Sequence, residues 1–365
     1  MHLLKRQIEV DIDQYLQSED IKILFVWGPR RSGKTTIINK LTQELGVKKY
    51  NFDLLSDREK FVPRREILEA IVQENKVILI DEVQSFPEAT IILKILFDEF
   101  KVKIIATGSS ELRQKSAREF DTLAGRFNEI YCLPLSISEV WENEKPKTSE
   151  MNIFTKKLAK NFQIYGAYPE VFLKEGKIDL LQHILDAYVL KDVKNTKLAK
   201  DILTKIALQL GSEVSVREIA TSLGAAPSTV ANYIEIFVKN YILISLPSFK
   251  TNTRKAVSEN RKLYFYDLGI RNTEFRQDKG GVFENFIVSE LEKMRKIKNE
   301  KINMYFYREY GGKEIDIIIE DYKKNYTTIE IKSKRGAAQE IFPLPNKSEI
   351  ITAENYFEKI CETKP

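Results

Sequence analysis

The chain has 365 residues, of which 43% are hydrophobic, and this composition excludes a disordered protein and allows two or three domains. The net charge of +5 permits nucleic-acid binding without requiring it. We find no run of 18 apolar residues and no signal-peptide core, so we expect a soluble, cytoplasmic protein without a membrane partner. With only two cysteines and two histidines, any metal should be held by carboxylates.

The strongest motif is a glycine-bounded segment that follows the apolar run Ile23–Val26 and precedes a helix. Its spacing predicts a loop whose backbone N–H groups face a polyphosphate, with Lys34 reaching the β- and γ-phosphates and the Thr35 hydroxyl binding Mg²⁺. The alternative is a glycine-bounded turn that holds a lysine by chance. The residues expected to bind the nucleotide are Gly28, Pro29, Arg30, Arg31, Ser32, Gly33, Lys34, Thr35, Thr36 and Asp81.

A second motif is the continuous apolar run Val77–Ile80, which ends in an acidic pair. Unbroken runs of this kind suit a central parallel strand covered on both faces. We expect Asp81 to hold Mg²⁺ and Glu82 to polarise the attacking water. The alternative is an ordinary solvated acidic pair at the end of a strand.

The flanking segments alternate between helical and strand patterns. This alternation predicts an α/β fold, a doubly wound parallel sheet with its ligand at the carboxyl ends of the strands. The expected elements are an amphipathic stretch at Ile8–Leu16, helices at Thr36–Leu45, Arg64–Glu74 and Glu88–Phe100, and strands at Lys48–Asp53, Val102–Thr107 and Phe127–Leu133.

Two further residues are candidates for catalysis. The strand that ends at Thr107 should lie beside the Asp81 strand, so the Ser109 hydroxyl could sense the γ-phosphate or the water; the alternative is a serine-rich turn. Arg126 is either an arginine finger that acts on the nucleotide of a neighbouring subunit, which implies a homo-oligomer, or a solvated surface arginine.

The segments GPRRSGKT, VILIDEVQ, IIATGSS, LAGR and PLSISE resemble, in this order, the AAA-type P-loop ATPases common in archaea and some bacteria. Members of that family carry a C-terminal nuclease-like domain of unknown function. The resemblance implies a P-loop ATPase core, at residues 1–145, that uses ATP and Mg²⁺. It carries over Lys34, Thr35, Asp81 and Glu82, and with them Ser109 and Arg126.

Residues 141–149 are charged and contain proline, so we expect a linker there, followed by a helical lid at 146–200. Residues 201–272 follow the pattern of a winged helix, with three helices and then two strands. The joining segment at 250–261 and the strand after it carry an excess of basic residues, which favours contact with DNA phosphates over the reading of base edges. The alternative is a packing module. The basic residues are Lys250, Arg254, Lys255, Arg261 and Lys262.

Residues 273–365 form the last expected domain. Glu284 shares a helical face with apolar residues, and period-two alternation places Asp316 opposite Ile315, Ile317 and Ile319. Glu330 and Lys332 share one face of a strand.

The order of these acids, followed by Glu-x-Lys, resembles the restriction-endonuclease-like superfamily, although Ile315 stands where a proline is usual. The resemblance implies a second Mg²⁺ or Mn²⁺ held by Glu284, Asp316 and Glu330, with Lys332 steadying the developing charge. The alternative is a buried ion cluster in an inactive nuclease fold.

Two functions are compatible with these patterns. The first is an ATP-driven enzyme that processes DNA. The second is a regulatory nucleotide switch whose rear domains only bind a partner.

Overall fold

The computed structural model describes residues 4–109, 123–186, 193–250, 261–274, 281–309, 312–332, 336 and 338–361. The chain divides into two units, Met1–Leu133 and Pro134–Pro365. Within the described residues, no helix is both long enough and apolar enough to span a membrane.

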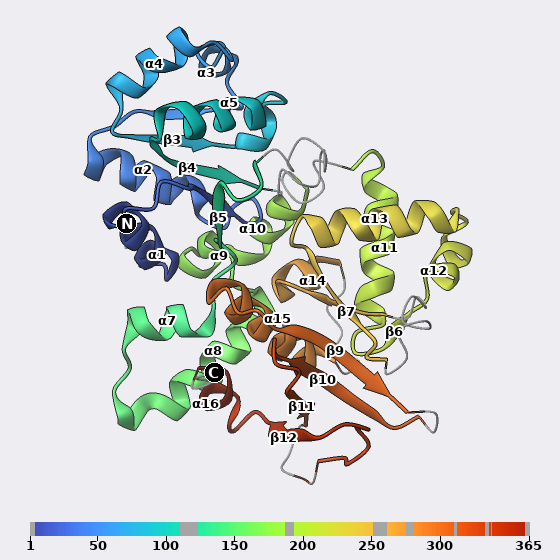
Figure 1. Ribbon diagram of the computed structural model, residues 1–365. Helices are drawn as coiled ribbons and strands as arrows, with labels where there is room; N and C mark the ends of the chain where they lie inside the picture. Colours follow the sequence, from blue (N-terminus) through green and yellow to red (C-terminus); the bar gives the residue numbers. More distant parts are fainter. Residues whose placement is uncertain are drawn as a thin grey trace. The chain divides into compact units, whose positions relative to one another are not determined.

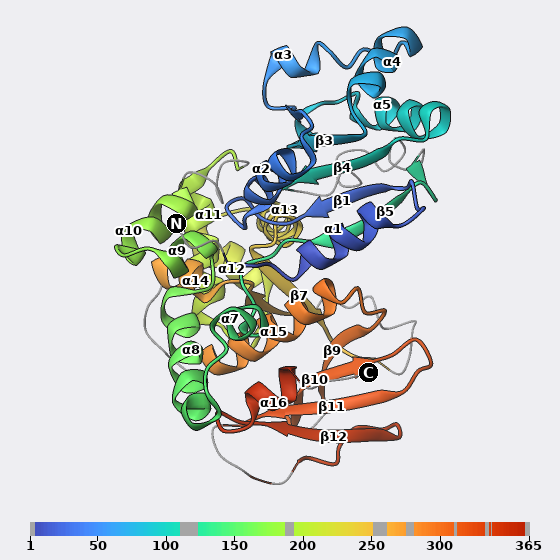
Figure 2. The ribbon, with the colours of Figure 1, turned by 90° about the vertical axis from the view of Figure 1, so that its left-hand side faces the viewer.

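The N-terminal unit is built on one five-stranded sheet with the order β2-β3-β4-β1-β5, in which every neighbouring pair is parallel. Figure 2 shows β3, β4, β1 and β5 in this sequence. The prediction of a parallel α/β sheet is therefore confirmed, as is the pairing of the Asp81 strand with the Thr107 strand. The strands are β1 (Ile23–Trp27), β2 (Lys49–Asn51), β3 (Val77–Asp81), β4 (Lys103–Gly108) and β5 (Phe127–Tyr131).

Apolar residues are buried on both faces of this sheet. Leu24 and Leu79 join a core cluster with residues of α1 and α2, while Phe25 and Ile78, of opposite phase, are also fully buried. This burial on both faces explains the continuous apolar runs in the sequence. The helices of this unit are α1 (Ile8–Gln17), α2 (Lys34–Leu45), α3 (Leu55–Arg58), α4 (Arg65–Glu74) and α5 (Ala89–Ile95), with short turns η1 (Val83–Ser85) and η2 (Leu96–Phe100) (Figure 1).

Helix α2 begins directly after the glycine-bounded loop. Gly33 precedes it with a φ of 109°, and Gly46 follows it in the left-handed conformation that terminates helices. The predicted stop at Gly46 is confirmed.

The C-terminal unit opens with helices, and one boundary differs from expectation. The stretch 141–144, which we assigned to a linker, forms the end of α7, because Ser136 and Glu139 build a capping box that starts this helix. The helices here are α7 (Ile137–Glu144), η5 (Thr148–Glu150), α8 (Met151–Tyr165), α9 (Pro169–Leu173) and α10 (Lys177–Ile184).

A small antiparallel sheet with the order β6-β8-β7 follows, accompanied by helices. Asn195 caps the first helix of this part through a hydrogen bond from Leu198 N to its Oδ1 (3.0 Å). The elements are α11 (Thr196–Leu208), β6 (Glu213–Val214), α12 (Val216–Leu223), α13 (Pro227–Lys239), β7 (Leu243–Pro247), β8 (Arg261–Phe265) and α14 (Leu268–Glu274).

The last part pairs α15 with a four-stranded sheet of order β12-β11-β10-β9, which Figure 2 shows strand by strand. Strands β9, β10 and β11 are antiparallel, and β12 adds in parallel to β11. The elements are α15 (Val282–Ile297), β9 (Asn303–Arg308), β10 (Glu314–Glu320), β11 (Tyr326–Ile331), β12 (Asn346–Ile351) and α16 (Tyr356–Cys361).

Strand β10 departs from regular alternation. Its pairing with β9 shifts between Ile315 and Ile318, and these two residues join the same core cluster with Phe249. The prediction that Ile317 and Ile319 share the face of Ile315 is therefore wrong, because the irregularity inserts an extra residue into the strand.

Candidate nucleotide site

The loop between β1 and α2 closes on its own lysine. Lys34 Nζ donates hydrogen bonds to the carbonyl oxygens of Gly28 and Pro29, both at 2.8 Å. The side chain is buried, and this burial lowers the pKa of Lys34. Gly28 is required by close packing, because a Cβ atom there would lie 1.9 Å from the carbonyl oxygen of Cys132. The loop is thus shaped around an ammonium group at its centre.

An arginine from the N-terminal segment holds the loop through hydrogen bonds. Arg6 is 5% exposed, and its guanidinium donates to the carbonyl oxygen of Ser32 (2.6 Å) and to that of Leu133 (2.6 Å). Arg6 was not among the site residues predicted from the sequence. These two bonds go to backbone carbonyls, which leave no residue-specific signal in the sequence.

The side chain of Ser32 gives the loop an unsatisfied polar atom. Ser32 is 0% exposed, and its Oγ has no hydrogen-bond partner in the part of the chain that the structure describes. Buried hydroxyls are normally bonded, so this atom fits a site that a phosphate oxygen would complete. Arg31, Thr35 and Thr36 are exposed and Arg30 is half-buried, so these side chains lie where a ligand can reach them.

The acidic pair lies at the carboxyl end of β3, beside β4. The Thr107 hydroxyl donates a hydrogen bond to Oδ1 of the buried Asp81. Glu82 adopts a left-handed conformation with φ of 55°, which costs energy for a residue other than glycine. Such strain at the end of a central strand is typical of functional sites.

Gln84 joins the two predicted catalytic side chains. Its Nε2 donates to the Glu82 carboxylate and to Oγ of Ser109 (3.0 Å), and its Oε1 accepts from Ser109 N (3.3 Å). The structure therefore brings Glu82 and Ser109 together through a residue that we had not identified. Gln84 lies two residues after Glu82, so its proximity to the acidic pair in the sequence was the available signal.

Arg126 does not join this group. It precedes β5, and its carbonyl oxygen accepts from Ile23 N (2.9 Å) at the amino end of β1, whereas the phosphate loop follows the carboxyl end. The guanidinium pairs with Asp98 (Nε to Oδ1, 2.8 Å). This position cannot serve the nucleotide of the same chain.

The acids predicted for the metal site of the last domain have separate hydrogen-bond and ion-pair partners. Glu330 pairs with Lys332 (2.9 Å) and accepts from Gln339 N, whereas Asp316 accepts from Ile331 N (2.7 Å). Among the described residues, no three His, Cys, Asp or Glu side chains form a group that could hold a metal ion. The described residues therefore give no support for a metal site of Glu284, Asp316 and Glu330, which stays a prediction.

Glu284 instead takes part in a cluster with a buried lysine. Lys262 is 0% exposed; its Nζ lies 3.2 Å from Oε1 of Glu284 and also contacts Glu314, and Tyr264 OH donates to the same Glu284 oxygen (2.6 Å). Burial opposes the charge of Lys262, but Glu284 and Glu314 together raise its pKa. Burial and the Glu284 charge raise the pKa of Asp316 to about 7.

The motif PLSISE and the segment YGAYPEVFL at residues 165–173 have packing roles in this unit. In the first, Ile137 N donates to Oε2 of Glu290 (2.8 Å). In the second, Ala167 N donates to Oδ2 of the buried Asp267 (2.6 Å), and a Cβ atom at Gly166 would lie 1.9 Å from Oδ1 of Asp267.

The fold and the loop define the N-terminal unit as a P-loop nucleotide-binding domain. Residues 20–141 match the AAA domain family, so this part of the chain is an AAA-type P-loop domain. Residues 156–279 and 279–344 match two families described only as domains of unknown function.

One curated relative is an uncharacterized protein of Methanocaldococcus jannaschii, 25% identical over 319 residues that cover 73% of this chain and 66% of that protein. The match therefore spans just under two thirds of the relative's length.

Similar solved structures include the Thermotoga maritima RuvB Holliday junction branch migration motor (16% identity, 67% of this chain, 89% of that chain, TM-score 0.30). A second is the Bacteroides Pif1 helicase in complex with ADP-AlF3 and single-stranded DNA (16%, 53% of each chain, TM-score 0.27).

Proposed function

We propose that this protein is a magnesium-dependent ATPase. The observation that carries the proposal is the loop built around the buried Lys34, which at present bonds the loop's own carbonyls and is placed to exchange them for phosphate oxygens. The loop N–H groups and the start of α2 would hold the phosphates. Thr35 and Asp81 would hold Mg²⁺, whose charge neutralises the transferred phosphoryl group when it is bound.

In this proposal Glu82 orients the attacking water. Gln84 bonds both the Glu82 carboxylate and Ser109, and so links the proposed water-orienting group to the proposed sensor hydroxyl. A carboxylate held in this way is already oriented before the reaction. It therefore stabilises the transition state better than a freely solvated carboxylate would.

We further propose that the ATPase acts on DNA. The order of elements α11, β6, α12, α13, β7 and β8 supports a winged helix, and a hollow of about 930 Å³ is lined by Arg217, Ser228 and Arg261 among others. Lys262 is excluded from phosphate contact, since it is buried. Arg254 and Lys255 lie outside the described residues.

ATP turnover should be measured with and without single-stranded, duplex and branched DNA. Stimulation by one of these forms supports action on DNA. Measurable turnover that no DNA form changes would remove that part of the proposal and leave the ATPase assignment intact.

A second candidate is a nucleotide switch whose C-terminal unit binds a partner. The contact between Lys262 and Glu284 favours it, because an internal cation already occupies the acid that the restriction-endonuclease-like resemblance requires for metal. Slow turnover, tight nucleotide binding and no cleavage of any DNA form with Mg²⁺ or Mn²⁺ would support the switch.

A further inference from the structure

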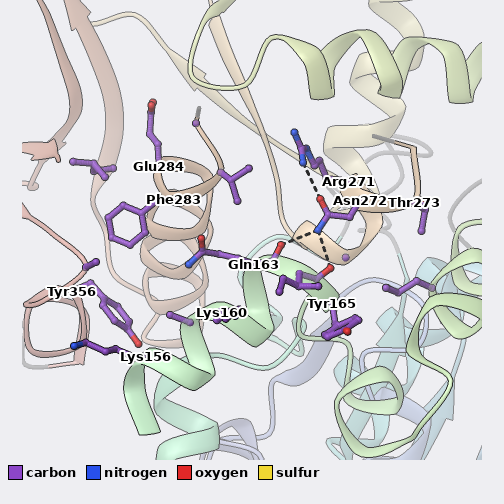
Figure 3. Close-up of a pocket in the computed structure, with 18 of the residues that line it drawn as sticks. Lys156, Lys160, Gln163, Tyr165, Arg271, Asn272, Thr273, Phe283, Glu284 and Tyr356 are labelled. Carbon is purple, nitrogen blue, oxygen red and sulfur yellow. Dashed lines mark hydrogen bonds between the residues drawn. The ribbon is translucent and has the colours of Figure 1, made fainter. Parts of the chain in front are cut away.

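A hollow of about 880 Å³ lies within the C-terminal unit, among α8, α14, α15 and the end of β11. This volume is within the range of ordinary small-molecule sites. Figure 3 shows side chains from these elements surrounding the hollow, with Phe283 and Glu284 on α15 and Lys156 and Lys160 on α8.

The charges around the hollow are mainly positive. Four described cations line it, against one acid, Glu284. Glu284 is paired with Lys262 and accepts a hydrogen bond from Tyr264. Lys332 forms an ion pair with Glu330. Lys156 and Lys160, in contrast, are exposed and form no ion pair with any described residue. The lining cations are Lys156, Lys160, Arg271 and Lys332.

One wall of the hollow carries a buried cation, Arg271. Arg271 is 1% exposed, and its Nη1 donates to Oδ1 of Asn272 (2.9 Å). Asn272 Nδ2 in turn donates to the carbonyl oxygens of Gln163 and Ile164, both at 2.8 Å, at the end of α8 (Figure 3). These bonds hold Asn272 against α8 and place Arg271 beside the hollow.

Another wall is the amino end of α15. This helix has 16 residues and starts at Gly281 without a side-chain cap, and Gly281, Val282 and Phe283 all line the hollow. The amino end of a long helix attracts anions. The half-buried rings of Phe283 and Tyr165 line the same space and offer flat apolar surfaces.

We propose that this hollow binds a nucleotide unit, with its phosphate between Lys156, Lys160 and the start of α15 and its base against an aromatic ring. Cationic groups beside aromatic faces are the combination by which proteins bind single nucleotides of a strand. The unit can come from a free mononucleotide or from the end of a single-stranded nucleic acid. The inference does not rest on ATP hydrolysis in the N-terminal unit.

The test uses the full chain with Lys34→Ala, which weakens nucleotide binding at the phosphate loop. Binding of a labelled 5′-phosphorylated oligothymidylate is compared between this protein and versions that also carry Lys156→Ala with Lys160→Ala, or Lys157→Ala. Lys157 is exposed on the same helix but does not line the hollow, so it is the matched control.

The paired lysine change should weaken binding by about tenfold or more, as expected when hydrogen bonds to a charged group are removed, and the control should not. The slope of log affinity against log salt should fall by roughly 0.7 for each phosphate that the protein no longer binds. If thymidine monophosphate displaces the labelled oligonucleotide, the hollow is a mononucleotide site. If it does not, the hollow binds the end of a strand. Equal affinities for all three proteins, or no binding of either probe, would overturn the proposal.

Discussion

Lys262 Nζ lies 3.2 Å from Oε1 of Glu284, so a lysine with no exposed surface neutralises an acid that the sequence had suggested as a metal ligand. Glu314 contacts the same ammonium group, and the ring of Phe306 lies 5.6 Å from it. The C-terminal unit thus contains a closed ion cluster that links β8, α15 and β10.

Replacing Lys262 should therefore destabilise the protein strongly. Lys262→Met leaves Glu284 without its cation, whereas Glu314 keeps its ion pair with Arg308 (Nη2 to Oε2, 3.0 Å). Removal of one partner from a buried ion pair costs roughly 3–5 kcal/mol. Chemical unfolding measures this cost, with the exposed Lys301→Met as control. Adding Glu284→Gln to Lys262→Met should recover part of the stability. A Lys262→Met protein as stable as the wild type would contradict the account of the cluster.

Asp316 should make the protein less stable as pH rises from about 4 to about 7. Burial and the charge of Glu284 raise its folded pKa from 3.8 to about 7, so in this window the folded state keeps a proton that the unfolded state releases.

Asp316→Asn should remove that dependence and stabilise the protein at pH 8 by about 2–4 kcal/mol. Thermal unfolding from pH 4 to pH 8 tests this, with the exposed Glu358→Gln as control. Destabilisation of Asp316→Asn across the whole range would be the opposite of the expected result.

Arg6 should contribute to ATP affinity although it lies outside the motif. Its guanidinium holds the Ser32 carbonyl, so Arg6→Met should loosen the loop and raise the Kd for ATP by about tenfold, the effect of losing a hydrogen bond from a charged donor. The exposed neighbour Lys5→Met serves as the comparison. Calorimetric titration with ATP gives both values, and equal Kd values would remove Arg6 from the site.

Arg126 tests whether the ATPase works as an oligomer. Since it lies at the amino end of the sheet and pairs with Asp98, it can act only on a neighbouring subunit. Arg126→Ala and Lys34→Ala proteins should each be inactive alone and regain some turnover when mixed. Full activity of the Arg126→Ala protein would show that Arg126 only forms a surface ion pair with Asp98.

The nucleotide-binding unit was largely predictable because buried parallel strands produce continuous apolar runs and the phosphate loop has a strict spacing. The pairing of β3 with β4 places Asp81 and Glu82 near Ser109, as expected from the order of the strands. Arg6 was not predictable, since a basic residue near the start of an amphipathic helix looks the same whether it is solvated or bonded to carbonyls.

The C-terminal unit was less predictable, for two physical reasons. The run of isoleucines in β10 does not show where the strand bulges, so the faces of Ile317 and Ile319 were misassigned. From the sequence, Lys262 was predicted to be a basic residue of the wing that contacts DNA phosphates. Sequence periodicity cannot show that acids from α15 and β10 enclose it.

The most direct test of the account compares ATP binding and single-turnover hydrolysis in wild-type, Lys34→Ala and Glu82→Gln proteins. Lys34→Ala should lose both binding and turnover. Glu82→Gln should keep ATP bound while turnover falls by on the order of a hundredfold or more, since only the positioning of water is lost. Normal turnover in Glu82→Gln, or ATP binding that is independent of Lys34, would contradict the proposed site.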